Sequence, residues 1–115
     1  MERTFYGLST KNSSYSEIKA LWIKVNDILE RNELENKDNW IRIGVTENDR
    51  YFLGIPVNHP EFKEEITIDC DEFEMINFKG SESDLFSFVK SQKNKMIVEI
   101  HTQLTKTNGV DLLLK

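Results

Sequence analysis

The order of elements that the sequence predicts is typical of an α+β fold: strand, helix, strand, strand, and then the same order again. Two segments space their apolar residues as a helix does, each behind a serine cap, and the segments between them alternate apolar and polar residues as strands do. The 115 residues, 38% of them hydrophobic, fit one compact domain. We therefore expect a single domain over 1–115 built from two βαββ units, about 2–58 and 64–115. Both helices should cover one face of an antiparallel sheet, with a ligand cleft on the other face.

The first helix is predicted over residues 16–31. Ser14 and Glu17 have the spacing of a capping box, in which each side chain satisfies a free backbone amide at the start of a helix. Behind this box the apolar residues recur at helical spacing: Ile18, Leu21, Trp22, Val25, Ile28 and Leu29. The charged, asparagine-rich residues 31–39 then predict a loop.

A β-hairpin is predicted next, with strands over 40–46 and 51–57 and a polar turn between them. Pro56 has no N–H to donate to a neighbouring strand, so the second strand should lie near an edge of the sheet or end there.

The second half of the chain predicts a similar set of elements. Residues 66–79 read as one bent strand or two short ones, in which the single Cys70 is expected to be a small core or strand residue. Ser81 and Asp84 start a second helix over 82–93. Strands over 96–104 and 110–115, joined by a turn at 106–109, complete the pattern.

A carboxylate interrupts the apolar run of residues 96–104, MIVEIHTQL. Alternation puts Val98 and Ile100 on one face of this strand, and Glu99 and His101 on the other. If the apolar face lies under the helices, Glu99 and His101 point to the open side of the sheet. Glu99 is then either a solvated strand residue or part of the wall of a binding site. His101 is more often a solvent-facing residue at such a position than half of an acid/base pair.

The chain resembles the GyrI-like effector-binding domains, which occur alone and as the sensing half of multidrug-responsive transcription activators. Nearly the whole chain takes part in the resemblance. The matching segments are Phe5–Leu8, Leu21–Trp22, Arg42–Val45 leading into Tyr51–Val57, Phe73–Gly80 and Val98–Ile100. The resemblance implies a duplicated βαββ fold whose halves meet at a cleft lined with aromatic residues. It also implies a glutamate on the penultimate strand that faces cationic, drug-like ligands, and Glu99 matches that glutamate.

The candidate ligand-binding residues are Glu99 together with Trp40, Phe52, Trp22, Tyr6 and His101. Trp40 and Phe52 are out of phase with the apolar residues around them, which places both on the same open face as Glu99. Trp22 lies on the apolar stripe of its helix, where it is either a core residue or part of the cleft wall. Tyr6 could reach the cleft from the first strand.

The composition excludes several classes of function. The 20 acidic and 15 basic residues give a net charge of −5, which repels a phosphate backbone, so we expect no direct binding to nucleic acid. The apolar runs fall far short of the ~18 to 20 residues that span a bilayer, and no secretion signal starts the sequence, so we expect a cytoplasmic protein without membrane contact. The sequence contains no phosphate loop, nucleophile elbow or metal-ligand cluster, so we predict no catalytic residue, metal or cofactor.

Two classes of function lead. One is a small-molecule binding protein for hydrophobic or cationic, drug-like effectors, acting as a sensor or a sequestering module. The other is a protein-interaction module that inhibits a larger partner, as the gyrase-inhibitor name of the family implies. A small hydrolase of electrophiles, with Glu99 as base, is third. A cavity with aromatic residues around Glu99 would favour the ligand binder, and a flat acidic face would favour the interaction module. The sequence leaves open whether the chain is a monomer or a dimer.

Overall fold

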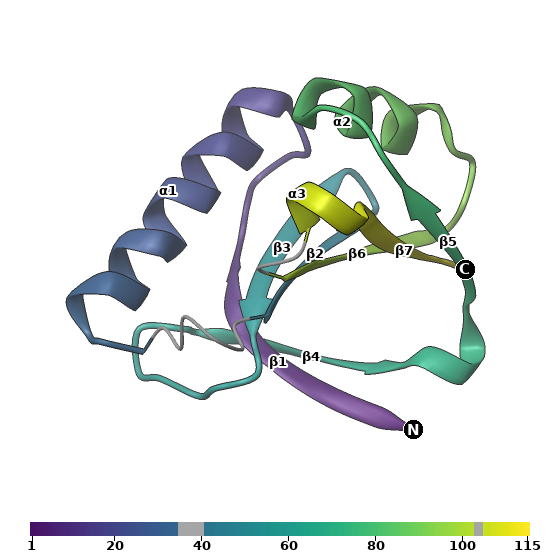
Figure 1. Cartoon of the computed structure of the whole chain (residues 1–115). Helices are drawn as coiled ribbons and strands as arrows, with labels where there is room; N and C mark the ends of the chain where they lie inside the picture. The colour runs from purple at the N-terminus through teal and green to yellow at the C-terminus, as the bar shows by residue number, and fades with distance from the viewer. Residues whose placement is uncertain (35–40, 103–104) are drawn as a thin grey trace.

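The computed structural model describes residues 1–34, 41–102 and 105–115, without the side chains of 106 and 107. Within these ranges the strands are β1 (Glu2–Ser9), β2 (Ile41–Glu47), β3 (Arg50–Ile55), β4 (Glu64–Asp69), β5 (Glu74–Phe78), β6 (Met96–Thr102) and β7 (Val110–Leu114). The helices are α1 (Tyr15–Arg31), α2 (Glu82–Ser91) and the single turn α3 (Thr105–Asn108), and a 3-10 turn η1 (Cys70–Glu72) separates β4 from β5. The α+β class is confirmed (Figure 1).

The predicted helix starts are capped by their serines. Ser14 Oγ accepts from the backbone amide of Glu17 at 3.4 Å. At α2 the capping box is complete, because Ser81 and Asp84 each accept a hydrogen bond from the backbone amide of the other. The expectation that Cys70 is a core or strand residue is wrong, because Cys70 is exposed and lies in the 3-10 turn η1.

The strands form one antiparallel sheet in the order β4-β1-β3-β2-β6-β7-β5. The predicted hairpin is the β2–β3 pair, and its turn residues Asn48 and Asp49 have φ of 53° and 60°. Two consecutive positive φ values are typical of a type I′ turn, whose twist matches that of paired strands. β3 ends at Ile55, directly before Pro56, although it lies between β1 and β2 rather than at an edge.

Both long helices cover the same face of the sheet (Figure 1). α1 packs Leu21, Val25, Ile28 and Leu29 against Tyr51, Leu53 and Ile55 of β3. α2 packs Leu85 and Val89 against Ile97 of β6 and against Val110 and Leu112 of β7. Gly44 of β2 pairs with Leu53 on one side and Glu99 on the other, so Glu99 lies on this helix-covered face. The expectation that Glu99 and His101 point away from the helices is therefore wrong.

The opposite face of the sheet carries a core of its own. Seven buried residues from six strands cluster there: Phe5, Ile43, Val45, Phe52, Ile68, Val98 and Leu113. Ile68 of β4 and Leu113 of β7 line the same small void of about 40 Å³. In a flat sheet the four strands between β4 and β7 would hold them more than about 20 Å apart. The sheet therefore curls, and its own side chains fill the concave face that was expected to hold a cleft.

No helix among the described residues has both the length and the apolar character needed to cross a lipid bilayer.

The curled face should contribute a large part of the stability. Leu113 is 1% exposed, so Leu113→Ala should lower the free energy of unfolding by about 2–5 kcal/mol through lost contacts and a cavity. Ile76 on β5 is 36% exposed, and Ile76→Ala should lower it by only about 1 kcal/mol. Urea unfolding of both variants measures the difference, and similar losses would mean that the curled face is not a packed core.

Candidate functional site

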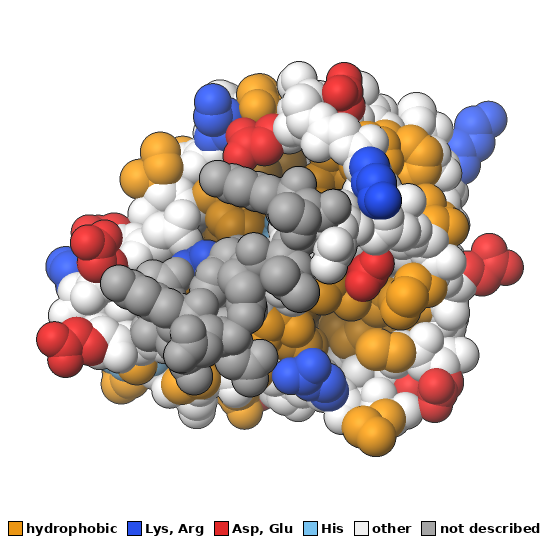
Figure 2. All heavy atoms as spheres, in the orientation of Figure 1, with side chains coloured by type: hydrophobic (Ala, Val, Ile, Leu, Met, Phe, Trp, Pro, Cys, Tyr) orange, Lys and Arg blue, Asp and Glu red, His pale blue; other side chains and the backbone are white. Residues whose placement is uncertain are grey.

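A cavity of about 660 Å³ lies between α1, α2 and the helix-covered face of the sheet. Its volume is within the ~300 to 1,000 Å³ typical of small-molecule pockets. α1 contributes Tyr15, Ile18, Lys19, Trp22, Ile23 and Asn26, and α2 contributes Glu82, Leu85, Phe86, Val89 and Lys90. Tyr51 and Glu99 belong to the part that the sheet forms. Figure 2 shows hydrophobic side chains in the recess between the two helices, with charged side chains around it.

Glu99 is a buried carboxylate at the sheet side of this cavity. It is 7% exposed, and its neighbours across the strands are Gly44 of β2 and Leu112 of β7. His101 Nε2 lies 3.0 Å from Glu99 Oε1, within hydrogen-bonding distance. The hydroxyl of Tyr51 also lies beside the carboxylate, whose charge acts on it. A buried carboxylate is tolerated only when its oxygens have such partners.

Trp22 and Tyr51 are hydrogen-bonded to each other beside Glu99. Trp22 Nε1 donates to the Tyr51 hydroxyl at 3.0 Å, and that hydroxyl lies close to the Glu99 carboxylate. The Trp22 ring also meets the His101 ring edge-on, with centroids 4.8 Å apart. The four side chains, from α1, β3 and β6, therefore hold one another in place.

Burial raises the pKa of Tyr51 well above its ordinary value of 10.0. The charge of Glu99 and its hydrogen bond raise this pKa further, and the bond from Trp22 opposes them only in part. Tyr51 therefore remains a neutral hydroxyl that can donate to Glu99.

Gly44 makes room for the Tyr51 side chain. A Cβ built on Gly44 would lie 2.0 Å from the Tyr51 hydroxyl oxygen and 2.6 Å from Cζ. The Tyr51 ring thus crosses the β2 backbone at Gly44 and reaches Glu99 on the next strand. A glycine within a strand often marks such a close approach.

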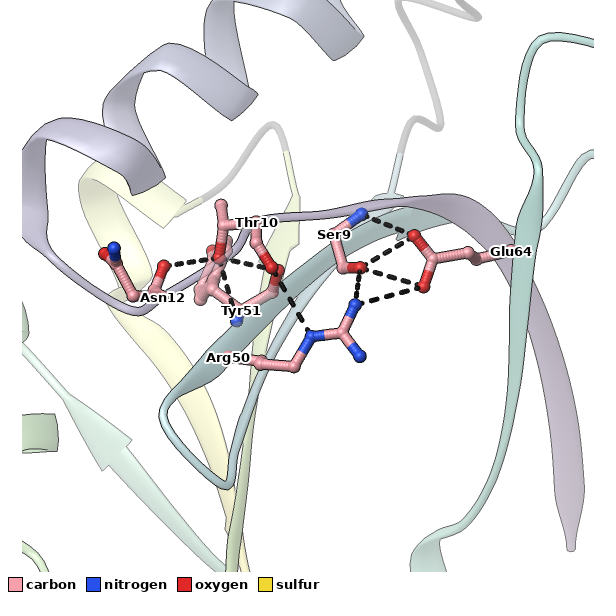
Figure 3. Close-up of polar contacts among 6 residues, drawn as sticks. All are labelled: Ser9, Thr10, Asn12, Arg50, Tyr51 and Glu64. Atoms are coloured by element: carbon pink, nitrogen blue, oxygen red, sulfur yellow. Dashed lines mark hydrogen bonds and ion pairs between the residues drawn. The ribbon is translucent and has the colours of Figure 1, made fainter.

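Polar contacts fix the backbone of Tyr51 to the end of β1 (Figure 3). Thr10 N donates to Tyr51 O at 2.9 Å, and Tyr51 N donates to Thr10 Oγ1 at 3.1 Å. Beside them, Arg50 donates to Ser9 Oγ at 2.7 Å, and this hydroxyl donates to Glu64 of β4 at 2.7 Å. Because α1 follows shortly after Thr10, these bonds help to set the position of Trp22 relative to Tyr51.

An aromatic pair joins the two helices at the edge of the cavity. The rings of Tyr15 on α1 and Phe86 on α2 have centroids 5.1 Å apart. Lys19 Nζ lies 5.2 Å from the Tyr15 ring centroid, and Lys90 Nζ lies 5.5 Å from that of Phe86, both within cation–π range.

A second contact ties α2 to the segment before α1 and to the β2–β3 turn. Lys90 donates to Ser13 Oγ and lies 3.8 Å from Asp49, to which Ser13 donates at 2.7 Å. The hydrogen bond from Ser13 lowers the pKa of Asp49, and the charge of Lys90 lowers it further.

The structure brings three of the sequence-predicted site residues together: Glu99, His101 and Trp22 all line the cavity. Tyr6 is on the helix-covered face but packs against the α1 core and is not among the cavity-lining residues. The expected placement of Phe52 is wrong, because it lies on the curled face in the opposite core. Trp40 falls outside the described residues.

Sequence reasoning missed Tyr51, whose hydroxyl accepts from Trp22 and lies beside Glu99. Tyr51 shares its strand phase with the buried Leu53 and Ile55, so alternation gives no reason to select it as a site residue. A signal was present in Gly44, because a glycine within a strand can mark the place where a large neighbouring ring crosses.

Comparisons with known proteins assign no role to this site. No family model matches the chain, and no curated protein or solved structure matches it. The role of the cavity therefore has to be inferred from its own side chains.

Gly44→Ala should disturb the site and the fold together. The added methyl group would displace the Tyr51 ring, so the free energy of unfolding should fall by about 1–3 kcal/mol. Gly80→Ala is the milder comparison, since Gly80 is exposed and its Cβ would meet the Phe78 ring at 3.1 Å, which requires only a small shift of that side chain; it should cost no more than about 1 kcal/mol. Equal urea midpoints for the two variants would contradict the close approach of Tyr51 to Gly44.

The raised pKa of Tyr51 predicts a specific loss of stability at alkaline pH. Tyr51→Phe should cost about 1–3 kcal/mol at neutral pH, because it leaves the Trp22 N–H without its acceptor and removes the hydroxyl that lies beside Glu99. Above pH 10.0, Tyr51 ionises in the unfolded chain while the folded chain keeps it neutral, so the wild type loses stability that the variant does not. The difference between the two proteins should therefore shrink from pH 10 upward in urea titrations. A difference that stays constant to pH 11 would show that folding does not change the ionisation of Tyr51.

Proposed function

We propose that this chain is a small-molecule binding protein whose ligand occupies the cavity between α1 and α2. The observation that carries the proposal is a buried carboxylate, Glu99, at the base of a cavity of about 660 Å³ with largely apolar and aromatic walls. A ligand with a flat apolar body would replace water against these walls, and a cationic or hydrogen-bond-donating group would bind Glu99.

The strand order supports a relationship to the GyrI-like effector-binding fold. On the two sides of the central β2–β6 pair the order is the same, β2-β3-β1 and β6-β7-β5. In each set a long helix connects the outermost of the three strands to the strand of the central pair. We propose that the two sets are copies of one βαββ unit, with β4 added beside β1.

The cavity favours a ligand binder over a protein-interaction module. A module that inhibits a larger partner would present Glu99 on an open, flat acidic surface. Glu99 is instead buried, with Tyr51 and His101 beside it and the Trp22 ring in contact with both of them. Rings in this position can add cation–π attraction of about 0.5–2 kcal/mol each to a bound cation.

Glu99→Gln tests the proposal, because it keeps the shape of the side chain and removes its charge. Affinity for a cationic rhodamine dye should fall by about 1.5–3 kcal/mol, as for ion pairs and charged hydrogen bonds in sheltered sites. A neutral dye of similar size should bind both proteins equally. Fluorescence titration measures each affinity.

Glu74→Gln is the matched control. Glu74 is an exposed glutamate on β5 that is not among the cavity-lining residues, so its variant should bind the cation as the wild type does. Equal affinity of the wild type and the Glu99 variant for the cation would contradict a ligand-binding role for Glu99.

A further inference from the structure

The charge at the edge of the cavity is opposite in sign to that of the whole chain. In the part of the chain that the structure describes, three lysines line it, Lys19 on α1, Lys79 before α2 and Lys90 on α2, against a single edge carboxylate, Glu82. All four are exposed, whereas Glu99 is buried at the base. The chain as a whole carries 20 acidic and 15 basic residues. A positively charged edge around a negatively charged floor is therefore a local feature of the cavity, and it does not follow from the composition of the chain.

Two of the three lysines keep their full charge available to a ligand. The ammonium group of Lys90 already interacts with Ser13 and Asp49. Among the described residues, by contrast, no carboxylate forms an ion pair with Lys19 or Lys79. The Lys19 ammonium lies over the Tyr15 ring, and the stem of Lys79 runs beside Gly109, with Cγ 2.9 Å from the position of a Cβ there.

Lys19 lies one helical turn from Trp22, whose partner Tyr51 lies beside Glu99. It precedes Trp22 by three residues on α1, so the two side chains leave the same side of the helix with Cβ atoms about 5–6 Å apart. One drug-sized molecule is therefore long enough to contact Glu99 at one end and Lys19 at the other.

We propose that the ligand is amphoteric: a flat, largely apolar molecule with a cationic or hydrogen-bond-donating group at one end and a carboxylate at the other. This inference rests on the proposed function of the same cavity. Glu99 binds the donor end, and Lys19 and Lys79 bind the carboxylate. A ligand with positive charge alone is repelled by the lysines at the edge, and a ligand with negative charge alone is repelled by Glu99.

Two rhodamine dyes with the same cationic ring system test the proposal. Rhodamine 110 carries a free carboxylate, and rhodamine 123 carries the methyl ester of the same group. Fluorescence anisotropy of the wild-type chain at low salt should show rhodamine 110 binding at least about threefold more tightly, the effect expected from two partly exposed ion pairs. At 1 M NaCl the preference should shrink, because salt screens exposed charges.

The double variant Lys19→Met and Lys79→Met removes the two charges and keeps the long apolar stems. It should abolish the preference for rhodamine 110 and leave the binding of rhodamine 123 unchanged or slightly stronger. Lys63→Met together with Lys93→Met is the control, since both lysines are exposed and neither lines the cavity; this variant should keep the preference. Glu99→Gln should weaken both dyes by the same factor.

The possible results separate this inference from the proposed function. If the wild type binds both dyes equally, and Glu99→Gln weakens both, the cavity binds cations but the amphoteric ligand is excluded. A preference that survives the Lys19 and Lys79 substitutions excludes it as well. If Glu99→Gln changes neither affinity, or if neither dye binds, the proposed function fails and this inference fails with it.

Discussion

The packing of Trp22, Tyr51 and His101 around the buried carboxylate of Glu99 is the interaction on which the site depends. A carboxylate with 7% exposure in the middle of a sheet is tolerated only if polar groups face its oxygens. His101 lies 3.0 Å from one of these oxygens, and the Tyr51 hydroxyl lies beside the carboxylate. Because Tyr51 is also bonded to α1, the requirement of one buried charge fixes how the helix sits above the sheet. The base of the cavity therefore has its shape before any ligand arrives.

The elements could be predicted because their signals are local. Ser14 and Ser81 mark helix starts through bonds within one turn, and Asn48 and Asp49 mark a hairpin through their own backbone preferences. α1 was expected over 16–31 and is found over Tyr15–Arg31. Capping, periodicity and turn chemistry involve residues only a few positions apart, so one sequence contains them in full.

The assignment of faces failed because alternation tells which residues share a face but not what covers that face. On β6, Val98 and Ile100 are apolar and were expected under the helices. They lie instead in the core of the curled face, which we call the curled core. Ile97, which shares the face of Glu99, is the β6 residue that packs against α2. The curl of the sheet decides the outcome, and it brings together Ile68 of β4 and Leu113 of β7, which lie far apart in the sequence. The same reversal places Phe52 in the core of the curled face and its neighbour Tyr51 at the cavity.

The two cores of this sheet divide the chain into residues that maintain the fold and residues free to diversify. The curled core contributes none of its seven buried residues to the lining of the helix-side cavity. It can therefore offset the stability lost when a substitution enlarges or recharges the cavity wall, and most substitutions lose some stability. Descendants of such a chain could change what they recognise at positions such as Ile18, Ile23 or Phe86 while the curled core stays as it is. Selection would then act on the two faces of one sheet at different rates.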